Sequence, residues 1–322
     1  MGKPKIRLNP RIRSAVSRSL LKQGVCFLLG IAMLLPKKEQ PPSGRGPKPY
    51  DYRKIAVLCI LRILMLKSYE DYEIEVRPRQ DIRKWLGLDK MPSKSTLHRG
   101  METFSMHFWR QWNSAMLKAW LRERVNVILD ASGIRIIGSS IWYCIRIKRS
   151  IRKHDCDKVH LAVCMDNLFV LNWCITASRK HESPFFERLL KPFKKLGLVL
   201  GDPGFCARKH FQFVADKGGA AFIWFKKNVT AKAKMCPAWK AAVTLWKSVL
   251  SWTYKAVYNQ RSKIEAVFSA LKRRYGDHFH SRKKHLRRRE LALRFIAYNL
   301  RLILYVRYAR QHGLPLWVRA KK

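Results

Sequence analysis

Two acidic residues stand directly after apolar runs, where a strand would end. Asp130 follows residues 125–129 and precedes Ala-Ser-Gly, and Asp202 follows residues 196–201 and precedes Pro-Gly. Sites in α/β sheets are built at the ends of strands, and the small neighbours leave room for a ligand to approach the backbone. For Asp202 alone, a turn-forming Asp before Pro-Gly explains the sequence equally well.

A third acidic residue, Glu265, lies in a segment whose pattern is helical. Its apolar residues recur at the spacing i, i+3, i+4 and i+7: Ile264, Val267, Phe268 and Leu271. If the helix reaches back to residue 258, one polar stripe beside the apolar one carries four functional groups, those of Tyr258, Arg261, Glu265 and Lys272. A solvated ion pair between Arg261 and Glu265, four residues apart, is the alternative interpretation.

These four polar residues match, without a gap, the Y-(2)-R-(3)-E-(6)-K signature of DDE transposases of prokaryotic insertion sequences, of the insertion sequence four/five type. The chain also resembles this family at residues 130–133 (Asp-Ala-Ser-Gly), 202–205 (Asp-Pro-Gly-Phe) and 298–300 (Tyr-Asn-Leu). Phe205 stands where the family commonly has Tyr. The resemblance covers about residues 50 to 305.

The resemblance implies a ribonuclease H-like α/β fold, which is a mixed five-stranded sheet with flanking helices. The first acid then lies on the first strand, the second after the fourth strand, and the third on a following helix. The stretch between Asp202 and Glu265 is longer than a compact crossover needs, so we expect an inserted β-rich segment at about 218–256.

The resemblance also implies the chemistry. Asp130, Asp202 and Glu265 would be the catalytic residues and would hold two Mg²⁺ ions, which Mn²⁺ could replace. Such a pair of ions activates water or a 3′ hydroxyl and stabilises the leaving oxygen of an in-line displacement. Tyr258 and Arg261 would bind a phosphate near the element end, and Lys272 would contact the DNA backbone.

The implied activity is binding of terminal inverted repeats, cleavage at the element ends and joining of the 3′ ends to double-stranded target DNA. Bringing two ends together implies a homodimer on DNA, in the cytoplasm at the nucleoid. A related metal-dependent nuclease without strand transfer and a catalytically inactive DNA-binding protein are the alternatives.

Composition supports a nucleic-acid partner. The chain has 322 residues and a formal net charge of +46, and its 48% hydrophobic content is enough to build folded cores. A polyanion best offsets such self-repulsion, with an acidic membrane surface as the second choice. The longest apolar run, residues 25–35, is too short to span a bilayer, so we expect no membrane partner.

A run of basic residues follows the signature between residues 273 and 290. We expect Arg273, Arg274, Lys283 and Lys284 in it to track the DNA backbone, whereas a solvated loop is the plain alternative.

The chain divides by pattern into a basic arm with a Pro/Gly linker (1–50), a small all-helical domain (51–122), the catalytic domain (123–310) and a basic tail (311–322). In the helical domain, a helix ending at Gly87 and a new helix capped by Ser93 or Ser95 have helix-turn-helix spacing. Lys94 and Arg99 near the start of the second helix would then contact DNA, although a plain structural turn has the same signals.

In the catalytic domain we expect strands at 125–130 and 141–147, two more between 160 and 176, and later ones at 196–200 and 220–225. Helices are expected after Ser183-Pro184 and at 207–216, 262–275 and 290–310. The first strands would form an antiparallel meander. The eight cysteines show no zinc-ligand spacing and are interpreted as reduced thiols.

Overall fold

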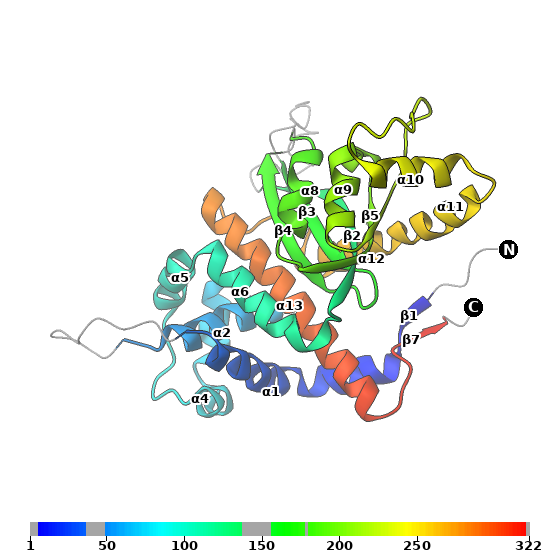
Figure 1. Cartoon of the computed structure of the whole chain (residues 1–322). Coiled ribbons are helices and arrows are strands. Elements are labelled where there is room, and N and C mark those ends of the chain that lie inside the picture. The colour runs from blue at the N-terminus through cyan, green and yellow to red at the C-terminus, as the bar shows by residue number, and fades with distance from the viewer. Residues whose placement is uncertain (1–5, 37–48, 137–155, 178–179, 320–322) are drawn as a thin grey trace, which may run out of the picture. The chain divides into compact units, whose positions relative to one another are not determined.

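The computed structural model describes residues 6–36, 49–136, 156–177 and 180–319. It comprises two compact units, Leu117–Arg288 and the combination of Met1–Met116 with Arg289–Lys322 (Figure 1). The predicted strand at 141–147 and most of the predicted linker lie outside the described residues. The boundary between the units falls within helices α6 (Met106–Leu117) and α13 (Lys284–Gln311).

The unit Leu117–Arg288 is built on a five-stranded mixed sheet of order β4-β3-β2-β5-β6. Its strands are β2 (Arg124–Arg135), β3 (Cys156–Cys164), β4 (Val170–Ala177), β5 (Lys195–Gly201) and β6 (Ala220–Ile223). β2, β3 and β4 form an antiparallel meander, whereas β5 pairs parallel to both β2 and β6. The predicted mixed sheet and its meander are confirmed, and this topology is compatible with a ribonuclease H-like fold.

Helices flank this sheet. They are α8 (Phe186–Leu190), α9 (Arg208–Asp216), α10 (Pro237–Lys247), α11 (Ser251–Asn259) and α12 (Lys263–Tyr275), with short 3-10 turns η1 (Lys118–Trp120), η3 (Ser183–Phe185), η4 (Pro203–Phe205) and η5 (Gln260–Ser262). α8 contacts β3 and β4, α9 contacts β6, and α12 contacts β2. The fully buried Phe186, Phe205 and Phe211 fill the core on the α8 and α9 side.

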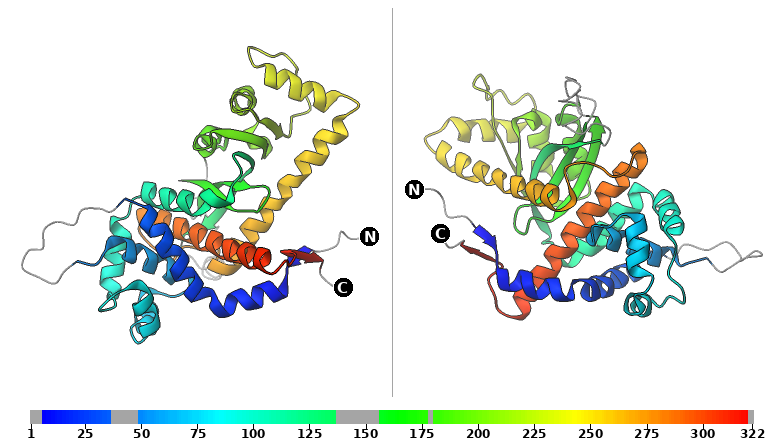
Figure 2. Two further views of the ribbon diagram at one scale, coloured as in Figure 1. Left: turned by 60° about the horizontal axis from the view of Figure 1, so that its bottom comes forward. Right: turned by 180° about the vertical axis from the view of Figure 1, so that it is seen from behind.

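The prediction of an inserted β-rich segment at about 218–256 is wrong in its structural type. β6 belongs to the central sheet, and the rest of the segment contains α10 and α11 (Figure 2). The reason is visible in the residue spacing, because Trp239, Val243 and Trp246 recur at four and three and so share one helix face. Trp239 and Val243 are buried, and the Trp246 ring packs against the Tyr254 ring at 5.3 Å.

The other unit is mainly helical. It contains α1 (Pro10–Leu34), α2 (Tyr52–Leu64), α3 (Tyr69–Val76), α4 (Gln80–Leu86), α5 (Lys94–Thr103), most of α6 and most of α13, with one antiparallel pairing of β1 (Ile6–Leu8) and β7 (Trp317–Arg319). α2 is buried without interruption from Ile55 to Leu64. Asn299 of α13 donates to Asn113 of α6 at 2.8 Å, and both side chains are fully buried.

This grouping differs from the predicted domain division. The N-terminal segment, which we expected to be a basic arm leading into a buried helix, is the single helix α1 of this unit. Residues from Arg289 onward join the same unit, where we expected the catalytic domain to continue to 310. The physical reason is that the middle of α13 is buried on all sides over residues 290–297, so the helix lies in the centre of a helical core. Its buried residues include Leu291, Ala292, Phe295 and Ile296.

Among the described residues, α1 is the single helix long and apolar enough to cross a membrane by length and composition. It begins fifteen residues before the apolar run that we recognised in the sequence, at Pro10 with Asn9 as its N-cap. α1 packs against α2 and α4. A Cβ placed on Gly24 would lie 3.6 Å from the side chains of both Leu64 and Leu300. These are the contacts of a core helix.

The two predicted boundaries of the helix-turn-helix segment lie where we expected them. α4 ends at Gly87, which adopts a left-handed conformation with φ of +56°. α5 begins after Ser93, whose hydroxyl accepts a hydrogen bond from the Thr96 N–H at 3.3 Å. α5 packs closely on α2, because a Cβ on Gly100 would lie 2.4 Å from Ile55 Cγ2.

Candidate active site

The register of the sheet brings Asp130 and Asp202 to neighbouring places. Leu129 of β2 pairs with Gly201, the last residue of β5, so each aspartate is the residue that follows this pair. Contrary to our expectation, β2 does not end at Asp130 but continues to Arg135. In this part it pairs with β3, and Arg135 also forms an isolated parallel bridge with His278. Asp130 is therefore the first residue of β2 beyond its pairing with β5. From this residue on, β5 no longer borders β2.

Asp130 and Ser132 face α12. Alternate residues of a strand point to the same side of the sheet, so these two side chains share a face. Arg261 Nη1 donates to Asp130 Oδ2 at 3.2 Å, and Lys272 Nζ donates to Ser132 Oγ at 2.8 Å. Two of the four signature residues thus reach this strand directly.

The signature residues lie on one nearly continuous helical segment formed by α11, η5 and α12. The two helices are joined by the single 3-10 turn η5, and they run on almost straight (Figure 2). The helical path therefore does reach back to Tyr258, with Arg261 in the 3-10 turn. Glu265 lies in the first turn of α12, four residues after Arg261.

Arg261 stands among all three predicted acids. Its Nη1 lies 3.2 Å from Asp130 Oδ2 and 3.6 Å from Asp202 Oδ1, and its Nη2 lies 4.0 Å from Glu265 Oε1. The guanidinium is 21% exposed, whereas the Glu265 side chain is 67% exposed. The pair within the helix is thus the longest of the three, so a solvated helix ion pair does not describe this arginine.

Burial makes Asp130 unusual. It raises the pKa of this carboxyl to about 6, against the opposing effects of a hydrogen bond from the Ala131 N–H and of the Arg261 charge. The negative charges of Asp202 and Glu182 raise this pKa further. A cation close to the three acids favours the ionised form of Asp130 and lowers its pKa, as the Arg261 charge already does.

The donor set suits a hard divalent cation, because it consists of carboxylate oxygens, the ligands that Mg²⁺ prefers. Within the described ranges, no three His, Cys, Asp or Glu side chains already form a ready-made ion site. The Arg261 guanidinium stands instead as the cation among the acids. By their chemistry the three carboxylates therefore fit a divalent cation, in the surroundings that the Arg261 guanidinium occupies here.

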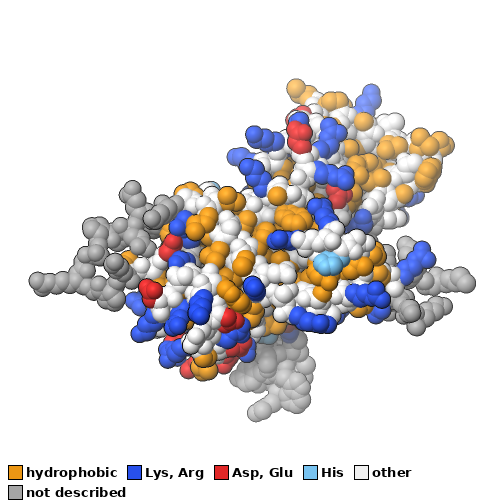
Figure 3. Space-filling model, turned by 90° about the horizontal axis from the view of Figure 1, so that it is seen from below, with side chains coloured by type: hydrophobic (Ala, Val, Ile, Leu, Met, Phe, Trp, Pro, Cys, Tyr) orange, Lys and Arg blue, Asp and Glu red, His pale blue; other side chains and the backbone are white. Residues whose placement is uncertain are grey.

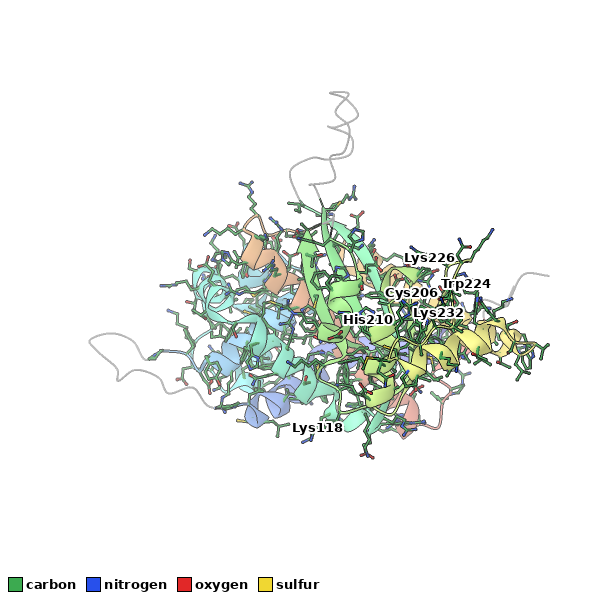
Figure 4. The ribbon with its side chains drawn as sticks, turned by 45° about the horizontal axis from the view of Figure 1, so that its top comes forward. Lys118, Cys206, His210, Trp224, Lys226 and Lys232 are labelled. Carbon is green, nitrogen blue, oxygen red and sulfur yellow. The ribbon has the colours of Figure 1, made fainter. Side chains whose placement is uncertain are left out.

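Tyr258 lies beside this cluster in an aromatic setting. The guanidinium carbon of Arg261 is 5.9 Å from the centre of the Tyr258 ring, and the ring of Trp224 is 5.0 Å from it. Burial raises the pKa of Tyr258. Trp224, labelled in Figure 4 near Lys226 and Cys206, follows β6 directly. We did not single it out from the sequence, although it lies in the apolar run at 220–225 that we expected to be a strand.

The other predicted DNA contacts are spread over both units. Lys94 and Arg99 line a pocket of about 430 Å³ with Tyr69, Ser95 and His98, and Lys94 pairs with Glu70 at 3.2 Å. Arg273, Lys283 and Lys284 are exposed, and Arg274 is half-buried. Figure 3 shows far more Lys and Arg than Asp and Glu side chains on the face that it presents.

A mixed sheet with one aspartate within a strand, a second after the neighbouring strand and a glutamate on a following helix is the arrangement expected of metal-dependent enzymes that process DNA. A family model described as the transposase DDE domain matches residues 122–300, which is more than half of the chain. The protein belongs to the DDE transposase family, as the resemblance predicted. Neither the search of curated proteins nor the search of solved structures finds a match.

Proposed function

We propose that this protein binds the terminal inverted repeats of an insertion sequence, cleaves DNA at the element ends and joins the 3′ ends to target DNA. The observation that supports this proposal is the contact of one arginine with three acids from β2, from the end of β5 and from α12. The fixed spacing of the signature residues points to the insertion sequence four/five type.

Asp130, Asp202 and Glu265 would hold two Mg²⁺ ions, with Mn²⁺ as a substitute. When bound, such ions activate the attacking oxygen and stabilise the leaving oxygen of a phosphoryl transfer. Arg261 exchanges the carboxylates for a phosphate of the element end, to which its planar guanidinium is well suited. Tyr258, whose ring lies beside the Arg261 guanidinium, contacts the same phosphate region of the element end.

Lys272 acts about two turns beyond Glu265 along α12. Its hydrogen bond to Ser132 holds the ammonium near β2, where it meets the DNA backbone next to the acids. Arg273, Arg274, Lys283 and Lys284 extend this contact along the duplex through charge alone.

Lys94 and Arg99 bind the inverted repeat from α5. Both lie on its first turns, where a helix N-terminus also favours a phosphate. We further propose that the protein acts as a homodimer on double-stranded DNA, because two ends must be joined together, and that it does so in the cytoplasm at the nucleoid.

The test is cleavage and strand transfer on labelled DNA carrying the element's own ends, with Mg²⁺ or Mn²⁺. The wild-type protein should join the ends to target DNA, and Glu265→Gln should bind DNA but leave it uncut. Cleavage without joining would favour a nuclease. Binding without any cleavage by the wild-type protein would indicate an inactive DNA-binding protein.

A further inference from the structure

The carboxylate of Glu182 is only half satisfied. Its Oε1 accepts from Lys158 Nζ at 2.8 Å. Its Oε2 is buried and has no hydrogen-bond partner in the part of the chain that the structure describes. Burying a carboxylate oxygen without a partner is costly, so such an atom calls for a role that uses it.

Glu182 lies against the turn that carries Asp202. A Cβ placed on Gly204 would be 2.9 Å from Glu182 Oε2 and 3.2 Å from its Cδ, so glycine at this position is what lets the carboxylate approach. The backbone of Glu182 is held as well, because its carbonyl accepts the Phe185 N–H at 2.9 Å where η3 begins. The free oxygen is thus fixed beside the Asp202 turn.

Glu182 adds a fourth carboxylate to the surroundings of the three predicted acids. It comes from the loop between β4 and α8 and lies beside the turn that carries Asp202.

We propose that Glu182 is a fourth acidic residue of this site and binds a divalent ion together with Asp202, directly or through a water molecule on the ion. The inference rests on the proposed function, because it takes the ion to be held by the three predicted acids. Lys158 holds one oxygen of Glu182 and leaves the other for the ion.

The experiment is a Mn²⁺ titration of the full chain, followed by the electron paramagnetic resonance signal of free Mn²⁺. Glu182→Gln keeps the shape and removes the charge, and it should weaken Mn²⁺ binding about tenfold, as the loss of a supporting ligand does. Glu187→Gln is the matched control, since Glu187 lies five residues away and pairs with Lys209 at 3.4 Å. It should bind Mn²⁺ as the wild-type protein does.

The variant Lys158→Gln tests whether Glu182 acts by binding the divalent ion or only through its ion pair with Lys158. If Glu182 binds the metal, removing Lys158 should weaken Mn²⁺ binding much less than Glu182→Gln does. Equal weakening by both variants, or no weakening by Glu182→Gln, would overturn the inference. Unfolding temperatures measured without metal should be similar for the variants that are compared.

Asp202→Asn distinguishes this inference from the proposed function. If Asp202→Asn binds Mn²⁺ more weakly and Glu182→Gln binds it as the wild-type protein does, the inference on Glu182 is wrong and the proposed function stands. A wild-type chain that binds no Mn²⁺ would overturn both proposals.

Discussion

Arg261 Nη1 lies 3.2 Å from Asp130 Oδ2, across 131 positions of the sequence. The arginine comes from the 3-10 turn between α11 and α12, and the aspartate from the middle of β2. This contact places a positive charge beside a carboxyl whose burial raises its pKa to about 6. Arg261 therefore performs, in the absence of metal, part of the neutralisation that a divalent ion would perform.

We expect Arg261→Gln to bind Mn²⁺ more tightly than the wild-type protein when DNA is absent, because the competing cation is gone. The same variant should bind DNA ends more weakly, by about 1–3 kcal/mol, since a charge-assisted contact with phosphate is lost. Calorimetric titration with Mn²⁺ and a gel-shift titration with end DNA measure the two effects. Weaker Mn²⁺ binding in this variant would mean that Arg261 supports the metal site and does not compete for it.

Each of the three acids should be indispensable for cleavage. Asp130→Asn, Asp202→Asn and Glu265→Gln should lower the rate of end cleavage by about 10³-fold or more, because the bound ions supply several kcal/mol of transition-state stabilisation. DNA affinity in gel shifts should stay near that of the wild-type protein. Residual cleavage above a tenth of the wild-type rate in any of them would exclude that residue as a metal ligand.

Variants of Lys272 and Ser132 should show whether the Lys272 charge contacts DNA independently of its hydrogen bond to Ser132. Lys272→Gln should reduce the slope of log affinity against log salt concentration by about 1, because one phosphate contact disappears. Ser132→Ala keeps the charge and should leave this slope unchanged, although it loses the 2.8 Å hydrogen bond. Binding isotherms at several salt concentrations measure both. An equal slope for Lys272→Gln and the wild-type protein would show that Lys272 meets no phosphate.

Stability should depend on pH through His160. This side chain is fully buried, and its burial together with the smaller effect of the Lys158 charge lowers its pKa to about 4. The unfolded chain then binds more protons than the native one between about pH 6.5 and pH 4, so stability falls as the pH falls through this window.

The variant His160→Gln should lose this dependence. Between pH 7 and pH 4, the free energy of unfolding of the wild-type protein should fall more than that of His160→Gln, by at most about 3 kcal/mol. Urea unfolding of both proteins without metal gives the comparison. Parallel pH profiles would mean that His160 is protonated equally in the folded and the unfolded chain.

Gly100 should tolerate no side chain. Ala is the better helix former by about 1 kcal/mol, but its Cβ would lie 2.4 Å from Ile55 Cγ2 in a buried contact of α5 with α2. We expect the overpacking to prevail and Gly100→Ala to lower the free energy of unfolding by about 1–3 kcal/mol. Thermal unfolding tests this, with Gly30→Ala in α1 as the control, because nothing lies within 4 Å of a Cβ there.

The sequence alone determined most of the elements and the identity of the acids. The 3.6-residue period places Tyr258, Arg261, Glu265 and Lys272 along one side of a helix, whatever that helix packs against. Apolar runs and turn residues likewise mark β2, β5 and the ends of α4 and α5. In residues 237–259 the same period was present in the tryptophan spacing, whereas our expectation of a β-rich insertion there rested on the length of the stretch and on the family resemblance.

Only the tertiary structure decided which groups meet. The pairing of Leu129 with Gly201 is a matter of sheet register, and it sets Asp130 beside Asp202. The contacts of Lys272 with Ser132 and of Glu182 with the Gly204 turn join segments that no local pattern relates. Local periodicity fixes the face on which a side chain lies, whereas register, helix packing and turn geometry choose its partner, and these depend on the whole chain at once.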